Sequence, residues 1–375
     1  MIDDAELRAW LRLLLLPGVG REGLRRLLAL FGTPEAVFEA HDLDLAERVG
    51  PKLAPLLREE PPDLQRRWLD ARDWLQGGAQ RHVLTLGDAH YPPALLESPD
   101  PPLLLFVQGD PSVLARPAVA IVGSRRPTPQ GREHALTFSR RLAQADFSVV
   151  SGLALGIDAA AHQGALDGDG CTVAVVGTGI DRVYPQAHRE LAHRIVLRGA
   201  LVSEYFIGTP PLAENFPRRN RIIAGLCRGT VVVEAALKSG SLITARLANE
   251  AGREVFAIPG SIQAPQSRGC HALIRDGAQL VESADEVLQV LGHLPWSTPA
   301  QPPHHDRAAS APQPQARALR DPLLDALGHD PTTLDSLQAR TGWPTPELLA
   351  RLLELELEGR VARLPGGLYQ RRGQA

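Results

Sequence analysis

The sequence predicts an α/β protein whose middle region folds as a parallel, doubly wound sheet. Between about residues 119 and 291, short β-branched apolar runs alternate with helical stretches, which is the pattern of parallel strands joined by helical crossovers. The segments on either side of this region have mainly helical patterns. The chain has 375 residues, a length that accommodates about two or three domains of ~150 residues each.

The composition is that of a folded protein without an overall basic charge. Hydrophobic residues make up 44% of the chain and charged residues 22%, which excludes a disordered or fibrous protein. Lys and Arg total 40 against 43 Asp and Glu, for a net charge of -3. Any site for a polyanion must therefore be local.

Neither a secreted nor a membrane protein is expected. The three cysteines are far apart and form no CxxC pair, which argues against a disulfide framework and a zinc site. The leucine run at 11–16 follows acidic residues and leads into Pro17, unlike a signal peptide. No apolar stretch approaches the ~20 residues of a membrane span. We expect a cytoplasmic protein with no membrane partner.

The first 81 residues are expected to form a helical domain. Helical segments separated by glycines are predicted at 4–16, 21–31, 34–40 and after Lys52. The turn at 16–20 before a leucine-rich helix is typical of a SAM/helix-hairpin-helix-like domain. Its amides either hold a phosphate at the helix start or only join two packed helices, and nearby acidic residues leave both interpretations open.

The middle domain is predicted to cover residues 82–293. Its parallel strands are expected at 119–122, 147–150, 172–176, 201–202, 231–233 and 255–258. Two further apolar runs, at 83–86 and 103–107, are separated by a proline-rich stretch. We expect them to extend the sheet at one side.

The rest of the chain is predicted to be a linker and a small domain. Residues 294–318 are rich in proline and poor in large apolar residues, which predicts a flexible linker. Residues 319–375 show the order of a winged-helix domain: three helices at 322–327, 333–340 and 345–358, then a hairpin. The third helix is expected to bury Leu348, Leu349, Leu352 and Leu353 and to leave its glutamates outward.

Small-residue turns follow the first three parallel strands of the predicted sheet. They are Gly123-Ser124-Arg125, the segment from Ser151-Gly152 to Asp158, and Gly177-Thr178-Gly179. These turns meet at the carboxyl edge of the sheet, where backbone N–H groups at helix starts bind anions. The first turn lacks a full GxGxxG fingerprint and the chain has no GxxxxGK[ST] element, so neither a dinucleotide nor P-loop ATP chemistry is expected.

The segment from Phe216 to Leu226 places three arginines and an asparagine at the start of an apolar helix. Cations at a helix N-terminus cost about 0.3–1 kcal/mol each unless an anion shares the site, so the cluster indicates a bound polyanion. Arginine also stacks on bases, and Phe216 offers a flat face beside it, which favours single-stranded nucleic acid. The alternatives are that Arg221 pairs with Glu204 or Glu234 and that Phe216 belongs to the core.

No active site is predicted. Asp158 and His162 share a helix face, and Glu204 and Glu234 end strands, but no nucleophile, base and orienting group are expected to converge. The serines of Ser239-Gly240-Ser241 are interpreted as helix caps whose amides hold another phosphate. We therefore expect no catalytic residues, no metal and no cofactor.

Several of these motifs together resemble the DNA processing protein A (DprA/Smf) family. The resemblance spans roughly residues 84–291, and the flanking modules resemble those of family variants with both accessory domains. It is carried by Gly123-Ser124-Arg125, Ser151-Gly152 to Asp158 with Ala161-His162, Tyr184-Pro185, Ser203-Glu204, Phe216 to Gly225, Glu234-Ala235, Ser239-Gly240-Ser241 with Thr244-Ala245, and Pro259-Gly260.

The resemblance implies an extended Rossmann-like fold that binds single-stranded DNA, dimerises and helps load the RecA recombinase during natural transformation. The DNA-binding residues it implies are Gly123, Ser124, Arg125, Ser151, Gly152, Phe216, Arg218, Arg219, Asn220, Arg221, Lys238, Ser239, Gly240 and Ser241. One departure is Gln186, where many members carry a basic residue that contributes to DNA binding.

Two other functions compete with this one. The phosphoribohydrolases that activate cytokinins share a related fold and use a PGGxGTxxE motif, whose glutamate is missing from the segment 239–246. A duplex-DNA regulator acting through the winged helix is disfavoured because the would-be recognition helix, 345–360, carries four glutamates against two arginines. The nucleotide-processing enzyme remains the alternative.

Overall fold

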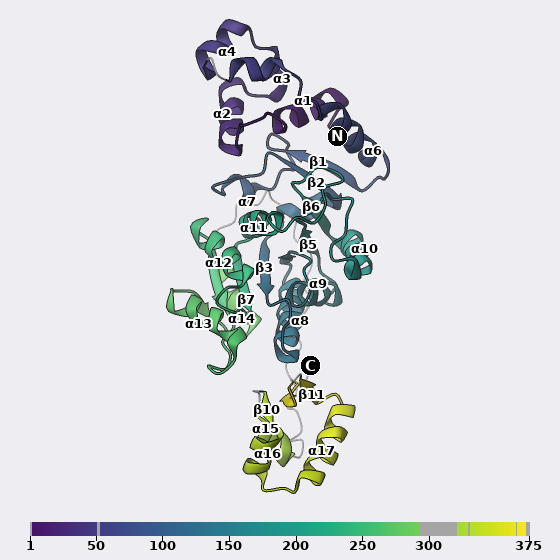
Figure 1. The fold of residues 1–375 in the computed structure, drawn as a ribbon, viewed down its shortest axis with the longest axis vertical. Coiled ribbons are helices and arrows are strands. Elements are labelled where there is room, and N and C mark those ends of the chain that lie inside the picture. Colours follow the sequence, from purple (N-terminus) through teal and green to yellow (C-terminus); the bar gives the residue numbers. More distant parts are fainter. Residues whose placement is uncertain (1, 51–52, 293–320, 329–330, 365, 373–375) are drawn as a thin grey trace, which may run out of the picture.

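The computed structural model describes residues 2–50, 53–292, 321–328, 331–364 and 366–372 (Figure 1). The predicted linker, 294–318, lies outside the described residues. No helix in the described ranges combines the length and the apolar character needed to cross a membrane.

A nine-stranded sheet forms the centre of the fold, in the order β1-β2-β6-β5-β4-β3-β7-β8-β9. From β6 to β9 all neighbours are parallel, whereas β1 and β2 add an antiparallel edge. The strands are β1 Arg81–Thr85, β2 Leu104–Gly109, β3 Ala118–Gly123, β4 Ser148–Ser151, β5 Thr172–Val175, β6 Ala200–Ser203, β7 Gly229–Val233, β8 Glu254–Ala257 and β9 Gln279–Leu280.

The predicted fold class is confirmed, and the two extra strands extend the sheet at one side as expected. The chain runs from β3 outward to β6 and then returns to the other side of β3 as β7. This change of direction opens a crevice outside the carboxyl ends of β3 and β7, where open α/β sheets bind their ligands. The two-residue strand β9 was not predicted.

Helices cover both faces of the sheet (Figure 1). One face packs against α8 Pro129–Gln144, α9 Ile157–Asp167 and α14 Ala284–Gly292, and the other against α11 Asn215–Leu226, α12 Gly240–Glu250 and α13 Arg268–Arg275. Successive residues of β3 pack on opposite faces of the sheet. Val119 and Ile121 pack against the layer of α8, α9 and α14, and Ala120 and Val122 pack against the layer of α11, α12 and α13. Helix α10, Arg189–Arg198, packs beside β5 and β6.

The N-terminal region is helical as predicted and packs directly on the sheet. Its helices are α1 Asp4–Leu14, α2 Arg21–Phe31, α3 Pro34–Glu39, α4 Asp42–Val49, α5 Ala54–Arg58 and α6 Leu64–Gln76. Their apolar residues form one continuous core with β2, β5 and β6. Trp74 on α6 meets the Phe106 ring edge-on at 5.7 Å between centroids. Helix α4 was not predicted.

The C-terminal region is a winged helix: α15 Pro322–Leu327, β10 Thr332–Thr333, α16 Leu334–Thr341, α17 Thr345–Leu357, β11 Val361–Leu364 and β12 Leu368–Arg371. It has its own small core. Helix α17 buries Leu348, Leu352 and Leu355, whereas Leu349 and Leu353 are exposed. The predicted stripe was wrong in this respect, because the buried face follows the helical i, i+4, i+7 spacing.

Candidate nucleic-acid interface

A groove of about 540 Å³ lies at the carboxyl edge of the sheet, and we call it the rim groove. It is built from the ends of β3 and β4 and the starts of α11 and α12, far apart in the sequence. Eight of the predicted DNA-binding residues line it: Gly123, Arg125, Phe216, Arg219, Asn220, Ser239, Gly240 and Ser241.

The turn after β3 presents Arg125 to the groove. A Cβ on Gly123 would lie 1.8 Å from the Val233 carbonyl oxygen, so only glycine lets β3 run this close to β7 at its end. Ser124 orders the turn by accepting the Arg126 amide at 3.1 Å. Arg125 itself is exposed and has no ion-pair partner among the described residues, which leaves its charge available to an anion.

Arg219 forms part of the groove floor and is only 4% exposed. Its Nη1 donates to the carbonyls of Gly152, at 2.9 Å, and Val175, joining the turn after β4 to the end of β5. Burial lowers the Arg219 pKa to about 10, against the opposing charge of Asp158. The arginine is therefore first a structural anchor, which the sequence prediction of a surface cation missed.

Asp158 and Ser151 are both buried at this end of the sheet, and Asp158 also lines the groove. The Asp158 carboxylate accepts the amides of Gly152, at 3.1 Å, and Ala154, at 3.3 Å, and burial raises its pKa. Ser151 donates its hydroxyl to the Ile121 carbonyl at 2.6 Å. The structure thus places the predicted pair Ser151-Gly152 in the support of the groove, because its polar groups already have partners within the chain.

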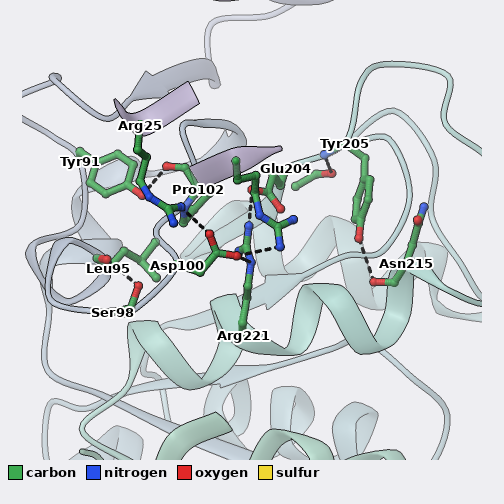
Figure 2. Close-up of polar contacts among 12 residues, drawn as sticks. Arg25, Tyr91, Leu95, Ser98, Asp100, Pro102, Glu204, Tyr205, Asn215 and Arg221 are labelled. Carbon is green, nitrogen blue, oxygen red and sulfur yellow. Dashed lines mark hydrogen bonds and ion pairs between the residues drawn. The ribbon is translucent and has the colours of Figure 1, made fainter. Parts of the chain in front are cut away.

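Arg221 lies away from the rim groove, in an ion-pair cluster (Figure 2). It pairs with Asp100, with 2.9 Å between Nε and Oδ2, and with Glu204. Asp100 also binds Arg21 and Arg25 of α2. The prediction that Arg218, Arg219 and Arg221 form one cationic cluster is therefore wrong, and the alternative pairing of Arg221 with Glu204 is the one observed.

The remaining polar residues of α11 differ in their availability. Arg218 is exposed outside the groove lining, and its one ion pair within the described part of the chain is a long contact to Glu214, at 3.7 Å. Asn220 donates to the Gly240 carbonyl at 3.3 Å, which ties α11 to the start of α12. The charge of Arg218 therefore lies at the margin of the groove. The hydrogen bond of Asn220 sets the distance between α11 and α12 across the groove.

Two aromatic rings form one wall of the groove. Phe216 and Tyr184 lie 5.6 Å apart between ring centroids with a tilt of 39°. Phe216 sits over Gly177, where a Cβ would be 2.9 Å from the ring. Tyr184 is 48% exposed. The sequence motif that contains Tyr184 gives no sign of its pairing with Phe216, since nothing in the local pattern links positions this far apart in the chain.

The start of α12 closes the groove on another side. Ser239 caps this helix and accepts the Ser241 amide at 3.3 Å, and the two hydroxyls are hydrogen-bonded to each other. Lys238 is exposed beside them but does not line the groove. The expected cap is present, and it adds the positive end of the α12 dipole to the groove.

The acidic and basic side chains of Glu234 and His162 are hydrogen-bonded to other residues of the sheet domain. Glu234 accepts the Thr128 amide at 2.9 Å and the Thr128 hydroxyl, and burial raises its pKa. His162 is fully buried beside the Thr172 hydroxyl, at 2.7 Å, and burial lowers its pKa to about 3. Across the described ranges, no three His, Cys, Asp or Glu side chains gather as a metal site would require.

The topology and the groove define a Rossmann-type protein with a crevice at the carboxyl edge of its sheet. The chain belongs to the DNA recombination-mediator protein A family, also named DprA/Smf: the model of that family matches residues 82–292. The model of the DprA winged helix domain matches residues 307–367. The resemblance inferred from the sequence motifs is thereby confirmed.

Two curated relatives match most of the chain. Protein Smf of Escherichia coli is 44% identical over 302 residues, covering 80% of this chain and 79% of the relative. Protein Smf of Synechocystis is 36% identical and covers 98% of this chain and 100% of the relative. Among solved structures, DNA processing protein A from Streptococcus pneumoniae is 38% identical, with a TM-score of 0.64, covering 77% of this chain and 98% of that one.

A second solved structure bears on the ligand of the family. DNA processing protein A from Helicobacter pylori, described as having a unique single-stranded DNA binding mode, is 33% identical to this chain. The match has a TM-score of 0.51 and covers 56% of this chain and 95% of that one. The likeness therefore extends to the sequence as well as the fold.

Proposed function

We propose that this protein binds single-stranded DNA in the rim groove. The proposal is supported by the combination, in one cavity, of Arg125, which has no ion-pair partner in the described ranges, the Phe216–Tyr184 ring pair and the α12 helix start. Cations and amides bind phosphates, and the rings stack on bases without reading their sequence. The H. pylori relative, described as a single-stranded DNA binder, supports this choice.

In the cell, the proposed role is to protect incoming single strands and to help load RecA during natural transformation and recombination. Membership of the family, whose relatives include the DNA processing protein DprA of Streptococcus pneumoniae at 50% identity over 201 residues, supports the role in DNA processing. The cytoplasm is the compartment where that DNA would be met. The three cysteines, all free and buried, suit a reducing compartment.

No catalysis is proposed for the groove. Glu234 is hydrogen-bonded to Thr128, and His162 is buried under the sheet's helix layer, so neither is oriented toward a substrate in the rim groove. The alternative, a nucleotide-processing enzyme, is tested by incubation with nucleoside monophosphates and labelled DNA. Base release or strand cleavage that persists through purification and disappears in Glu234→Ala would support the enzyme.

A homodimer is proposed through the end of the sheet that carries β9. Val281, Val287 and Leu291 are buried and close the core there, while Leu280 remains exposed on the edge strand. Because the N-terminal helices share a core with the sheet, the full chain is the right sample for light scattering. Twice the monomer mass is expected, and a monomer at all micromolar concentrations would rule the dimer out.

The experiment that tests the proposed function compares three proteins: the parent chain, Arg125→Ala and the control Arg246→Ala. Both arginines are exposed, and Arg246 lies on α12 outside the groove lining. We expect Arg125→Ala to weaken binding of an oligothymidylate by about 10-fold at moderate salt, because it removes a phosphate contact. Parent-like affinity in Arg125→Ala would contradict the groove assignment.

A further inference from the structure

Helix α17 of the winged helix carries two separate rows of leucines (Figure 1). One row is buried in the small core of this domain and consists of Leu348, Leu352 and Leu355. The other row, which we call the leucine face, consists of Leu349, Leu353 and Leu357. Its members are 43%, 56% and 81% exposed, so nothing in the described part of the chain covers them.

The leucine face is a continuous stripe rather than a scatter of surface side chains. Its members are four residues apart, so they lie one above the other along the helix. Single exposed leucines are common on protein surfaces, whereas an aligned apolar row is typical of an interaction site. The winged-helix core does not need these side chains, because α17 already packs against α16 and β11 through its buried row.

Glutamates border the leucine face on both sides. Glu356 follows Leu353 by three positions and Glu354 precedes Leu357 by three, which places the two carboxylates on opposite sides of the stripe. Glu356 is exposed and has no ion-pair partner among the described residues. Glu354 pairs with Arg351, with 2.6 Å between Oε2 and Nη1, but that guanidinium also binds the N-cap carboxylate of α15. The border of the face therefore keeps a negative charge.

This combination of apolar row and acidic border selects among possible occupants. The glutamates would repel phosphates, which argues against DNA. A second copy of α17 would bring the same glutamates opposite each other, and like charges across a helix pair are destabilising. A helix with Lys or Arg beside its own apolar row fits both features, because the aliphatic stems cover the leucine edges and the charged ends reach the carboxylates.

We propose that the leucine face of α17 binds an amphipathic helix of another protein, one whose apolar row is bordered by lysines or arginines. The partner's apolar side chains bury the leucine face, and its cations pair with Glu354 and Glu356. The site does not depend on the rim groove, because other residues form it and the winged helix has a core of its own. The winged helix then recruits a partner protein to the chain.

The test uses the full chain and a designed helical peptide of about 20 residues, long enough to form a helix, whose leucine row is bordered by lysines and arginines. Fluorescence anisotropy should show saturable binding to the parent chain. Leu353→Ser/Leu357→Ser should weaken binding by at least about 10-fold, because two buried leucine contacts are lost. The matched control, Leu30→Ser/Leu197→Ser, changes exposed leucines on α2 and α10 and should bind like the parent.

The acidic border is tested separately. Glu354→Gln/Glu356→Gln should weaken binding about 2- to 5-fold at low salt and by less at high salt, since exposed ion pairs are weak and screened. The control Glu22→Gln/Glu250→Gln removes the same charge from exposed positions on α2 and α12 and should have no effect. A peptide with the same leucine row bordered by glutamates should bind the parent at least about 10-fold more weakly.

Several results would overturn the proposal. Absence of saturable binding of the basic peptide, or equal losses in Leu353→Ser/Leu357→Ser and its control, would show that the leucine face takes no such helix. A lower mass of that variant than of the parent in light scattering would show that a second copy covers the face. Weaker binding of an oligothymidylate by the same variant would assign the face to DNA. Circular dichroism should match the parent throughout, because the exchanged side chains are exposed.

Discussion

Arg219 and Gly152 are in direct contact, because the Arg219 guanidinium donates to the Gly152 carbonyl at 2.9 Å. A Cβ on Gly152 would lie 2.6 Å from the same guanidinium. A glycine in one turn and an arginine 67 positions later are therefore one structural unit. The groove floor depends on this pair, since the same guanidinium reaches the Val175 carbonyl at the end of β5.

Gly152→Ala is expected to destabilise the protein by about 1–3 kcal/mol, because the added methyl group must displace a buried guanidinium. Urea or thermal unfolding measures the change. Gly87→Ala is the control, because no atom lies within 4 Å of the position its Cβ would take, and it should leave stability nearly unchanged. Equal stability of the two variants would show that Arg219 moves aside at no cost.

Arg221→Gln is expected to reduce stability without changing how DNA binding depends on salt. The side chain is 11% exposed and holds Asp100 and Glu204 together, so its loss should cost about 1–3 kcal/mol, less than the ~3–5 kcal/mol of a fully buried pair. The slope of log affinity against log salt should match the parent, because the residue contacts no phosphate. A reduced slope would show that Arg221 contacts a phosphate of the bound DNA.

His162 is expected to make stability fall in acid. Its pKa is about 3 in the folded protein, lowered by burial, against ~6.5 in the unfolded chain. Between these values the unfolded state binds a proton that the folded state does not, so the free energy of unfolding falls as pH falls from about 6.5 toward 3, by about 1.4 kcal/mol per pH unit. His162→Gln should lack this one-proton contribution, and an unchanged slope would contradict the assignment.

Truncation after Leu291 is expected to leave single-strand affinity within a few-fold of the full chain. The winged helix has a separate core, and the exposed face of α17 carries Leu353, Leu357 and several glutamates, which suit a protein surface better than phosphate. Among the described residues, the Gln370 side chain of the winged helix donates a hydrogen bond to the Gln130 side chain of the sheet domain, at 2.8 Å. A loss of about 1.4 kcal/mol, or 10-fold, would make the wing a DNA-binding element.

The sequence predicted the sheet well because β-branched runs and glycine turns are local signals. The two-residue strand β9 is too short to leave such a signal. At the candidate site, the glycine turn with Arg125 and the cap at Ser239 were predictable, since each depends on neighbouring residues. The burial of Arg219 was not, because it depends on a carbonyl in a distant turn.

The arginines of α11 show a different limit. Residues 218, 219 and 221 are close in the sequence, but successive helical positions turn by about 100°, so a cluster along the chain does not make a cluster on the surface. Helical geometry alone places Arg219 on another face than Arg218 and Arg221, whereas Arg218 and Arg221, three positions apart, lie within about 60° of each other. Which of them meets a carboxylate depends on Asp100, which precedes β2 and is brought to α11 by the tertiary fold.

The most direct test of the rim groove is photo-cross-linking of the full chain to an oligonucleotide carrying 5-iododeoxyuridine, with the attached peptides identified by mass spectrometry. We expect cross-links at Phe216 and Tyr184, whose paired rings form the stacking wall of the groove. Cross-links confined to the N-terminal helices or to α17, with none in the segments around these two rings, would contradict it.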